Sequence, residues 1–290
     1  MNQPISSPLP TDRHISPSAQ TVVRPVAEHV ASDHRDTGTL GKALTVLSVI
    51  AQSPHPMRFT DLLKQVDQPR GTLHRHLSNL VGEGLLRLNH DHTYEPGLRL
   101  LTLAANAWSK NSFRVVAEPH MRNLQRQTGE TVHLGALNGL EVVYLDKLES
   151  NQSVRMHSQV GNASPLYCTG IGKAMLARLA PEEAANRMSQ MSFIKHTANT
   201  LHTPELLSKD LELIRQRGIS HDREEHEPGI FCVAAGIVHG ATRDVSGISV
   251  TAPSFRIQPD TIERWEHLVR QTANAIENDL AVLMGPRAME

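Results

Sequence analysis

Apolar residues in the first hundred positions recur with the 3.6-residue period of amphipathic helices. They predict three helices, in 39–52, 59–68 and 69–82. Thr60 is expected to cap the second helix, and Gly82 to end the third. The core-facing positions are predicted to be Leu40, Ala43, Leu44, Leu47, Ile50 and Ala51 in the first helix, Leu62, Leu63 and Val66 in the second, and Leu73, Leu77 and Leu80 in the third.

The segment after the third helix predicts a short hairpin, because leucines at 85–88 lead into the polar turn NHDHTYEPG. Two helices, a turn, a third helix and a hairpin form a winged helix-turn-helix, which we expect to span residues 37–98. A strongly apolar helical segment follows, and we expect 99–112 to be a linker helix. Its apolar surface exceeds what a free linker tolerates, so we expect it to pack against a partner subunit in a homodimer or a dimer of dimers.

The remainder of the chain, 113–290, mixes both periodicities and predicts an α+β domain. Asn138-Gly139 between two alternating runs, TVHLGAL and EVVYLDKL, predicts a β-hairpin. Further strands are expected at VRMHS, GISHD, FCVAAGIV and SGISVTA, and further helices at FRVVAEPHMRNLQRQTGE, GKAMLARLA, PELLSKDLELIRQRG and TIERWEHLVRQTANAIENDLAVL.

The bulk composition narrows the class of protein only slightly. Residues 1–36 are rich in Pro, Ser, His and Asp without periodicity, so we expect a disordered tail. The chain has neither a signal-peptide pattern nor an apolar run of about 20 residues, so no membrane is expected and the cytoplasm is the expected compartment. Its two cysteines are interpreted as reduced thiols.

The start of the third helix is the candidate DNA-reading segment. Residues 68–82 contain no Asp or Glu, whereas Arg70, His74, Arg75 and His76 all fall there. In helix-turn-helix proteins this end of the second helix of the motif enters the major groove, where Arg pairs with guanine. The alternative is a solvated basic helix. The candidate DNA-binding residues are Arg70, Gly71, Thr72, His74 and Arg75.

Residues 38–285 resemble the IclR-type bacterial transcriptional regulators. The resemblance rests on PRGTLHRHLSNLVGEGLLRL, TGETVHLGALN, SPLYCTGIGKAMLA, DREEHEPGIFCVAAGIV and ISVTAP, in matching order. Within the family, the chain looks nearest to the branch of the 2-keto-3-deoxygluconate regulators. Family members typically carry Lys-Ser-Thr-Val-His-Arg where Arg70-Gly71-Thr72-Leu73-His74-Arg75 stands here, so Gly71 lacks a hydroxyl that could bind phosphate. The resemblance implies a winged helix-turn-helix, a linker helix and a GAF-like α+β effector-binding domain.

The resemblance also implies an effector pocket over the sheet, for a keto acid, sugar acid or aromatic acid. Carried over by position, its lining falls on Met156, Ser164, Gly170, Ile171, Asp222, Cys232, Ser249 and Thr251. Thr169 is expected to cap a helix whose N–H groups bind the carboxylate. Ser249 and Thr251 alternate with apolar residues, so both hydroxyls leave one face of a strand. The alternative is that these residues fill a core without a ligand.

Two further motifs indicate no catalytic or metal chemistry. Gly170-Ile171-Gly172-Lys173 does not match a Walker A loop, because Tyr167 replaces its first Gly and Ala174 its Ser/Thr; Lys173 is interpreted as a surface charge. The cluster at 221–226 lacks HExxH spacing, so we expect no metal or other cofactor, although a metal site including a cysteine stays an alternative. We therefore expect a repressor of a catabolic operon that binds double-stranded DNA, and not an enzyme. The alternatives are an enzyme or metal-binding sensor acting through the C-terminal domain, and a winged-helix assembly factor.

Overall fold

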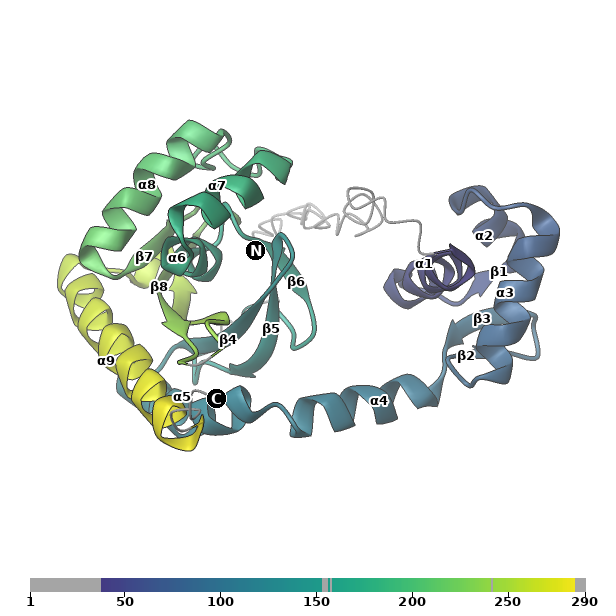
Figure 1. The fold of residues 1–290 in the computed structure, drawn as a ribbon, viewed down its shortest axis with the longest axis horizontal. Coiled ribbons are helices and arrows are strands. Elements are labelled where there is room, and N and C mark those ends of the chain that lie inside the picture. The colour runs from purple at the N-terminus through teal and green to yellow at the C-terminus, as the bar shows by residue number, and fades with distance from the viewer. Residues whose placement is uncertain (1–37, 153–155, 157, 241, 285–290) are drawn as a thin grey trace, which may run out of the picture. The chain divides into compact units, whose positions relative to one another are not determined.

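A computed structural model describes residues 38–152, 156, 158–240 and 242–284. The chain divides into two compact units with a boundary between Leu101 and Thr102 (Figure 1). The predicted disordered tail at 1–36 lies outside the described residues, as does most of the strand expected at VRMHS. No helix in the described part of the chain is long and apolar enough to cross a bilayer.

The first unit is a winged helix-turn-helix, as predicted. Its helices are α1 (Gly38–Gln52), α2 (Phe59–Gln65) and α3 (Arg70–Gly82), and its wing is a sheet in the order β1-β3-β2, with β1 (Met57–Arg58), β2 (Leu86–Leu88) and β3 (Thr93–Pro96). The buried residues of α3 are Leu73, Leu77 and Leu80, as predicted, together with His76.

Two local expectations in this unit were wrong, and one strand was not predicted. Leu40, Leu44 and Ala51 are exposed, because Val46, Leu47 and Ile50 supply the buried face of α1. The second helix begins at Phe59, so Arg58 and not Thr60 occupies the N-cap position. The strand β1, which pairs with β3, was not predicted.

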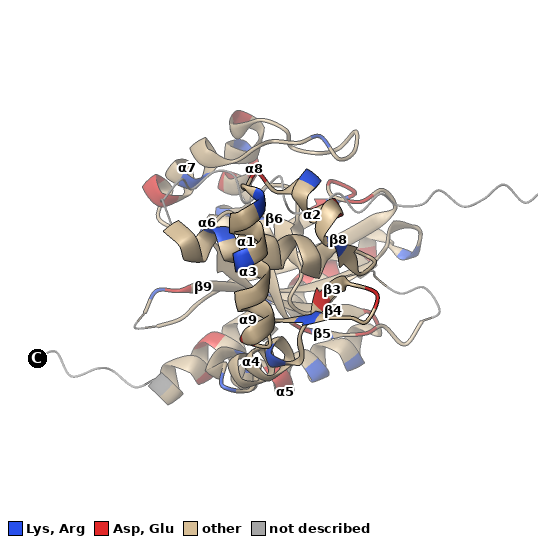
Figure 2. Ribbon diagram, turned by 90° about the vertical axis from the view of Figure 1, so that its right-hand side faces the viewer, with Lys and Arg blue, Asp and Glu red and all other residues tan. Residues whose placement is uncertain are grey.

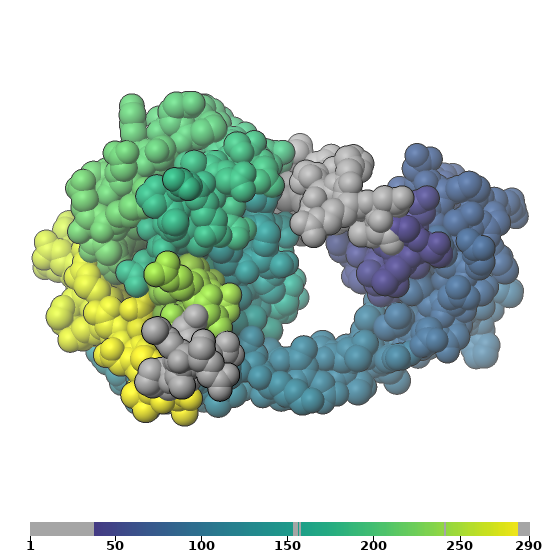
Figure 3. Space-filling model, viewed as in Figure 1, coloured from purple at the N-terminus to yellow at the C-terminus, as the bar shows by residue number. Residues whose placement is uncertain are grey.

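Helix α4 (Leu98–Ser109) follows the wing and has no buried residue. Its side chains lie at the molecular surface (Figure 3), and large apolar ones are among them: Leu98 is 76% exposed, Leu101 67% and Leu103 51%. An apolar surface of this kind is typical of a contact with another chain.

The second unit has an antiparallel sheet in the order β6-β5-β4-β9-β8-β7. The strands are β4 (Thr131–Asn138), β5 (Glu141–Leu148), β6 (Ala163–Pro165), β7 (Ser220–Arg223), β8 (Ile230–Val238) and β9 (Val245–Pro253). The helices are α5 (Ser112–Thr128), α6 (Gly170–Arg178), α7 (Pro181–Gln190), α8 (Pro204–Arg217) and α9 (Pro259–Met284). The unit is therefore α+β, as predicted. Neither β6 nor α7 was predicted. The β4–β5 turn is Gly139-Leu140, one residue later than expected.

The sheet separates two apolar cores because its strands alternate. Val233, Ala235 and Ile237 of β8 point to one face and pack with α5 and α9. Cys232 and Ala234 point to the other face and pack with α6 and α8. Figure 1 shows α9 and α5 on one side of the sheet and α6 with α8 on the other. The second of these faces carries the candidate pocket.

Candidate functional site

The first candidate site is the exposed face at the start of α3. Burial of the leucines turns the opposite face outward, so Arg70, Gly71, His74 and Arg75 are exposed and Thr72 is half-buried. The helix carries arginines and no acidic residue (Figure 2). Its first N–H groups and its arginines together favour an anionic partner such as a phosphate backbone.

Phe59, the first residue of α2, organises part of this surface. The guanidinium carbon of Arg70 lies 5.5 Å from the centre of its ring, and the His74 ring centre lies 6.2 Å from it. A cation–π contact of this type restricts the Arg side chain without consuming its hydrogen-bond donors. The start of α3 is thereby tied to the start of α2.

His76 does not add to this basic surface, contrary to expectation. Its side chain is buried, and its Nδ1 lies 2.9 Å from Oε1 of Gln68. Gln68 in turn donates to the carbonyl of Lys42 in α1. Burial, together with the nearby Arg75 and Lys42 charges, lowers the pKa of His76. His76 therefore connects the helices as a neutral side chain.

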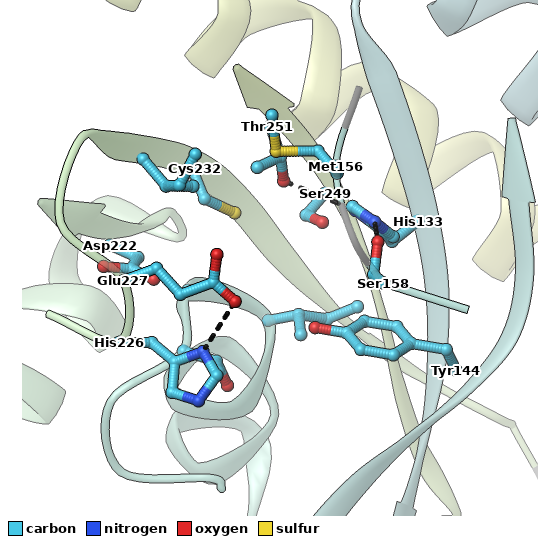
Figure 4. Close-up of a pocket in the computed structure, with 14 residues that line it drawn as sticks. His133, Tyr144, Met156, Ser158, Asp222, His226, Glu227, Cys232, Ser249 and Thr251 are labelled. Atoms are coloured by element: carbon cyan, nitrogen blue, oxygen red, sulfur yellow. Dashed lines mark hydrogen bonds and ion pairs between the residues drawn. The ribbon is translucent and has the colours of Figure 1, made fainter. Parts of the chain in front are cut away.

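The second candidate site is a pocket on the α6 face of the sheet (Figure 4). Strand pairing builds its floor, because residues directly opposite one another share a face. One row joins Asp222, Cys232 and Thr251; the next joins Ser249 to His133. The pocket is partly open to solvent, and it combines apolar walls with hydroxyl, carboxyl and imidazole groups, the mixture typical of a small-molecule site.

A row of glycines next to this floor lets α6 approach the sheet. Gly135, Gly236 and Gly247 lie opposite one another on β4, β8 and β9. A Cβ atom on Gly247 would lie 2.8 Å from Cγ1 of Ile171, and one on Gly236 would lie 2.5 Å from the carbonyl oxygen of Ala174. Side chains at these positions would therefore push α6 away from the pocket.

The N-terminus of α6 forms part of the pocket wall. Thr169 caps the helix as predicted, since its Oγ1 accepts a hydrogen bond from the Gly172 N–H at 3.2 Å. Gly170 and Ile171, which follow the cap, both line the pocket. Their position brings the positive end of the helix dipole to the ligand space.

Seven of the eight residues carried over from the family lie together in this lining. They are Met156, Gly170, Ile171, Asp222, Cys232, Ser249 and Thr251. Ser164 is not among the lining residues. It lies on β6 opposite Val142 and hydrogen-bonds the side chain of Tyr144, which does line the pocket.

The pocket also contains residues that sequence reasoning missed: His133, Tyr144, Ser158, His226, Glu227 and Ile230. His133 Nε2 lies 2.6 Å from the Ser158 hydroxyl, and the His133 and Tyr144 ring centres are 5.0 Å apart. Burial lowers the pKa of His133 to about 3, so the imidazole is neutral. The sequence did offer one indication that His133 lines a pocket, because this histidine interrupts the largely apolar run TVHLGAL.

Asp222 places a carboxyl group on the pocket floor. Burial raises its pKa to about 7, although its Oδ1 accepts a hydrogen bond from the backbone N–H of Glu225 at 2.7 Å. A carboxyl group with this pKa can accept a hydrogen bond from a ligand hydroxyl, or donate one to a ligand oxygen when protonated.

Lys173 is not a surface charge, contrary to expectation. Only 1% of it is exposed, and its ammonium group lies 2.6 Å from Glu225 and 2.8 Å from Asp210. These ion pairs join α6 to α8 and to the segment after β7. The Lys173 charge is thus directed toward the buried carboxylate of Glu225 and the half-buried one of Asp210.

Comparison with known proteins agrees with this architecture. The IclR helix-turn-helix domain family matches residues 39–90, and the bacterial transcriptional regulator IclR C-terminal family matches 105–278. HTH-type transcriptional regulator KdgR of Dickeya chrysanthemi is 31% identical over 76% of this chain and 73% of its own length. HTH-type transcriptional repressor AllR of Escherichia coli is 31% identical over 90% of this chain and 96% of its own. The crystal structure of Thermotoga maritima IclR matches with a TM-score of 0.65 and 30% identity, covering 83% of this chain and 98% of that one.

A winged helix-turn-helix followed by an α+β domain with a small-molecule pocket defines a DNA-binding transcriptional regulator. This chain belongs to the IclR family of such regulators, near its KdgR members.

Proposed function

We propose that this protein is a cytoplasmic repressor of a catabolic operon, which binds its operator as a homodimer or dimer of dimers and responds to a small organic acid. The observation that carries the proposal is the exposed, acid-free start of α3 in a winged helix-turn-helix. The names of the matched relatives support repression, since AllR and the IclR of E. coli are both described as repressors.

In this proposal the start of α3 enters the major groove. Arg70 and Arg75 supply planar groups that can bind guanine through two hydrogen bonds, and His74 lies beside them. Thr72 supplies a hydroxyl for phosphate and a methyl for thymine. The N–H groups around Gly71 approach a phosphate closely, because this residue has no side chain.

The pocket chemistry supports an organic acid as the effector. The N–H groups of Gly170 and Ile171 favour the carboxylate, and Met156 with Ile171 supplies apolar walls. The Asp222 carboxyl group and the floor hydroxyls of Ser249 and Thr251 can form hydrogen bonds with the keto or hydroxyl oxygens of such an acid. Cys232 is small enough to leave room above the sheet.

Binding is better supported than turnover. Burial raises the pKa of Cys168 and raises that of Cys232 to about 12. Neither cysteine is therefore an activated thiolate at neutral pH, which is what a nucleophilic cysteine requires. The acid would bind in the C-terminal domain. It would act by binding more tightly to the protein when the DNA-binding domains have one arrangement than when they have another.

A mobility-shift assay tests the proposal. The full chain should retard the DNA upstream of its own gene, and one acid from a panel of keto acids, aldonates and aromatic acids should change the affinity. The variant Asp222→Ala/Ser249→Ala should keep DNA binding and lose this response. An unchanged response in that double variant would place the sensor site elsewhere, and failure to bind any upstream DNA would refute operator binding.

A further inference from the structure

A thiol and two imidazoles meet beside the effector pocket. Cys168, His196 and His226 each offer one ligand atom, and these atoms all lie within 4.8 Å of one another. Cys168 is buried immediately before the α6 cap, and His226 lines the pocket. The His196 and His226 rings meet edge to face, with their centres 5.1 Å apart.

The loop that carries His196 is fixed against the segment that carries His226. Thr197 Oγ1 donates to the carbonyl of Glu224 at 2.6 Å, and Thr200 Oγ1 donates to that of Glu225 at 2.7 Å. Asn199 Nδ2 donates to the carbonyl of Arg223 at 2.9 Å. Residues distant in sequence are thereby held together by the fold, as a preformed site requires.

Tyr167 determines the orientation of the His196 ring. Its hydroxyl donates to the Ile194 carbonyl at 2.8 Å and lies 3.0 Å from Nε2 of His196. The same hydroxyl accepts a hydrogen bond from the Ile194 N–H at 2.9 Å, so it is fixed in front of the His196 ring. A hydrogen bond that orients the ring is typical of a metal-bound histidine.

We propose that Cys168, His196 and His226 bind a zinc ion at the edge of the effector pocket. One thiolate and two imidazoles are a ligand set that Zn²⁺ prefers, and three protein ligands leave a fourth position for water or a ligand oxygen. Tetrahedral zinc needs ligand atoms about 3.5 Å apart, so the side chains close by roughly 1 Å. Binding displaces the thiol proton of Cys168 to solvent, so affinity rises with pH.

The site gives the proposed effector pocket a Lewis-acidic contact for a carboxylate or keto oxygen. This second part rests on the proposed function, whereas the metal site does not.

Cobalt(II), a spectroscopic substitute for zinc, tests the site in the purified full chain. One equivalent should bind and give thiolate-to-cobalt charge-transfer absorption together with the intense d–d bands of a tetrahedral centre. Zinc should displace it. Cys168→Ser should abolish the charge-transfer band, and His196→Gln should weaken binding at least tenfold; its exposed position makes loss of folding an inadequate explanation. His202→Gln, which removes another imidazole of the His196 loop, should retain the spectrum.

A wild-type chain that binds no stoichiometric cobalt or zinc, or a Cys168→Ser variant with the wild-type spectrum, would overturn the metal site. Either result would leave the mobility-shift test of DNA and effector binding unaffected. If cobalt binds but the acid identified in that assay leaves the cobalt spectrum unchanged, the metal site stands and its contact with the effector is refuted.

Discussion

The indole nitrogen of Trp108 donates a hydrogen bond to the backbone carbonyl of Leu145 at 2.7 Å. Leu145 is available because the β4–β5 register shifts there: Asp146 lies opposite Leu134, and Tyr144 lies opposite Gly135. A bulge of this kind leaves one residue unpaired in the ladder. The end of α4 is thus attached to β5 at the bulge.

Two further contacts strengthen this attachment and connect it to the pocket. The Arg114 guanidinium lies 3.7 Å from the Trp108 ring centre and pairs with Asp146 at 3.0 Å. The adjacent Lys147 donates to the carbonyls of Met156 and Ser158, both pocket residues. One strand therefore contacts both α4 and the proposed ligand site.

Replacing Trp108 with Phe should weaken the effector response while operator binding without ligand persists. The change keeps an aromatic ring under Arg114 and removes the indole N–H, which costs about 1 kcal/mol of stability. Effector titrations in the mobility-shift assay would measure the response, and Arg126→Ala, a surface change on α5, is the control. An effector midpoint equal to that of the wild type would show that this hydrogen bond carries no signal.

The α3 surface predicts a specific loss from Arg75→Ala. Arg75 is exposed, so the fold should be retained, and loss of a base contact should cost about 1–3 kcal/mol of operator affinity. Fluorescence anisotropy with operator and with scrambled DNA would separate a base contact from a phosphate contact, since the latter weakens both equally. Arg70→Ala should behave similarly, with Arg122→Ala as the control. Wild-type operator affinity in both α3 variants would show that α3 is not the recognition helix.

Gly71→Ser should tighten DNA binding. A Cβ atom at Gly71 meets nothing within 4 Å, so a side chain fits without rearrangement. A serine hydroxyl at the helix start would add a phosphate contact, which other members of the family are expected to make. Gly71→Ala is the matched control, because it adds the carbon without the hydroxyl. Equal affinities of the Ser and Ala variants would contradict the proposed contact.

Local periodicity was sufficient to predict which way a residue points when its direction follows from its own helix or strand. Leu73 and Leu77 are buried as the helical period predicted, and Ser249 and Thr251 share the pocket floor as strand alternation predicted. The helix cap at Thr169 was likewise readable, because a cap depends on residues within three positions.

Contacts between segments that are distant in sequence could not be predicted from local periodicity. Lys173 finds its carboxylates 37 and 52 residues away, so nothing near it in sequence indicates burial. His133 joins the pocket because β4 pairs with β9, more than a hundred residues later. The bulge at Leu145 likewise exists only through the register of β4 and β5.

The exposed leucines of α4 predict a loss of assembly when one becomes charged. Leu101→Glu should shift the protein toward monomer and reduce operator affinity, because a buried unpaired carboxylate costs several kcal/mol at an interface. Light scattering at micromolar concentration would measure the oligomeric state. Leu213→Glu, at an exposed leucine of α8, is the matched control and should leave assembly intact. A wild-type protein that is monomeric under these conditions would contradict the assigned role of α4.

His133 predicts part of the pH dependence of stability. Its pKa is about 3 in the fold, and an unfolded chain has the ordinary imidazole value near 6.5. Above about pH 6.5 both states are neutral and His133 adds no pH dependence. As the pH falls from about 6.5 toward 3, the unfolded state takes up the proton first, so the free energy of unfolding decreases, by on the order of a few kcal/mol in full.

His133→Gln should therefore make the acid-side decrease in stability shallower. Glutamine keeps a side-chain amide for Ser158 but cannot be protonated in this range. Urea unfolding between about pH 7 and pH 4.5 would measure the slope. It should be reduced and not abolished, because burial also lowers the pKa values of His76, His221, His226 and His239. His90→Gln, in the exposed wing turn, should retain the wild-type slope; the same slope in His133→Gln would show that His133 is protonated equally in the folded and unfolded states.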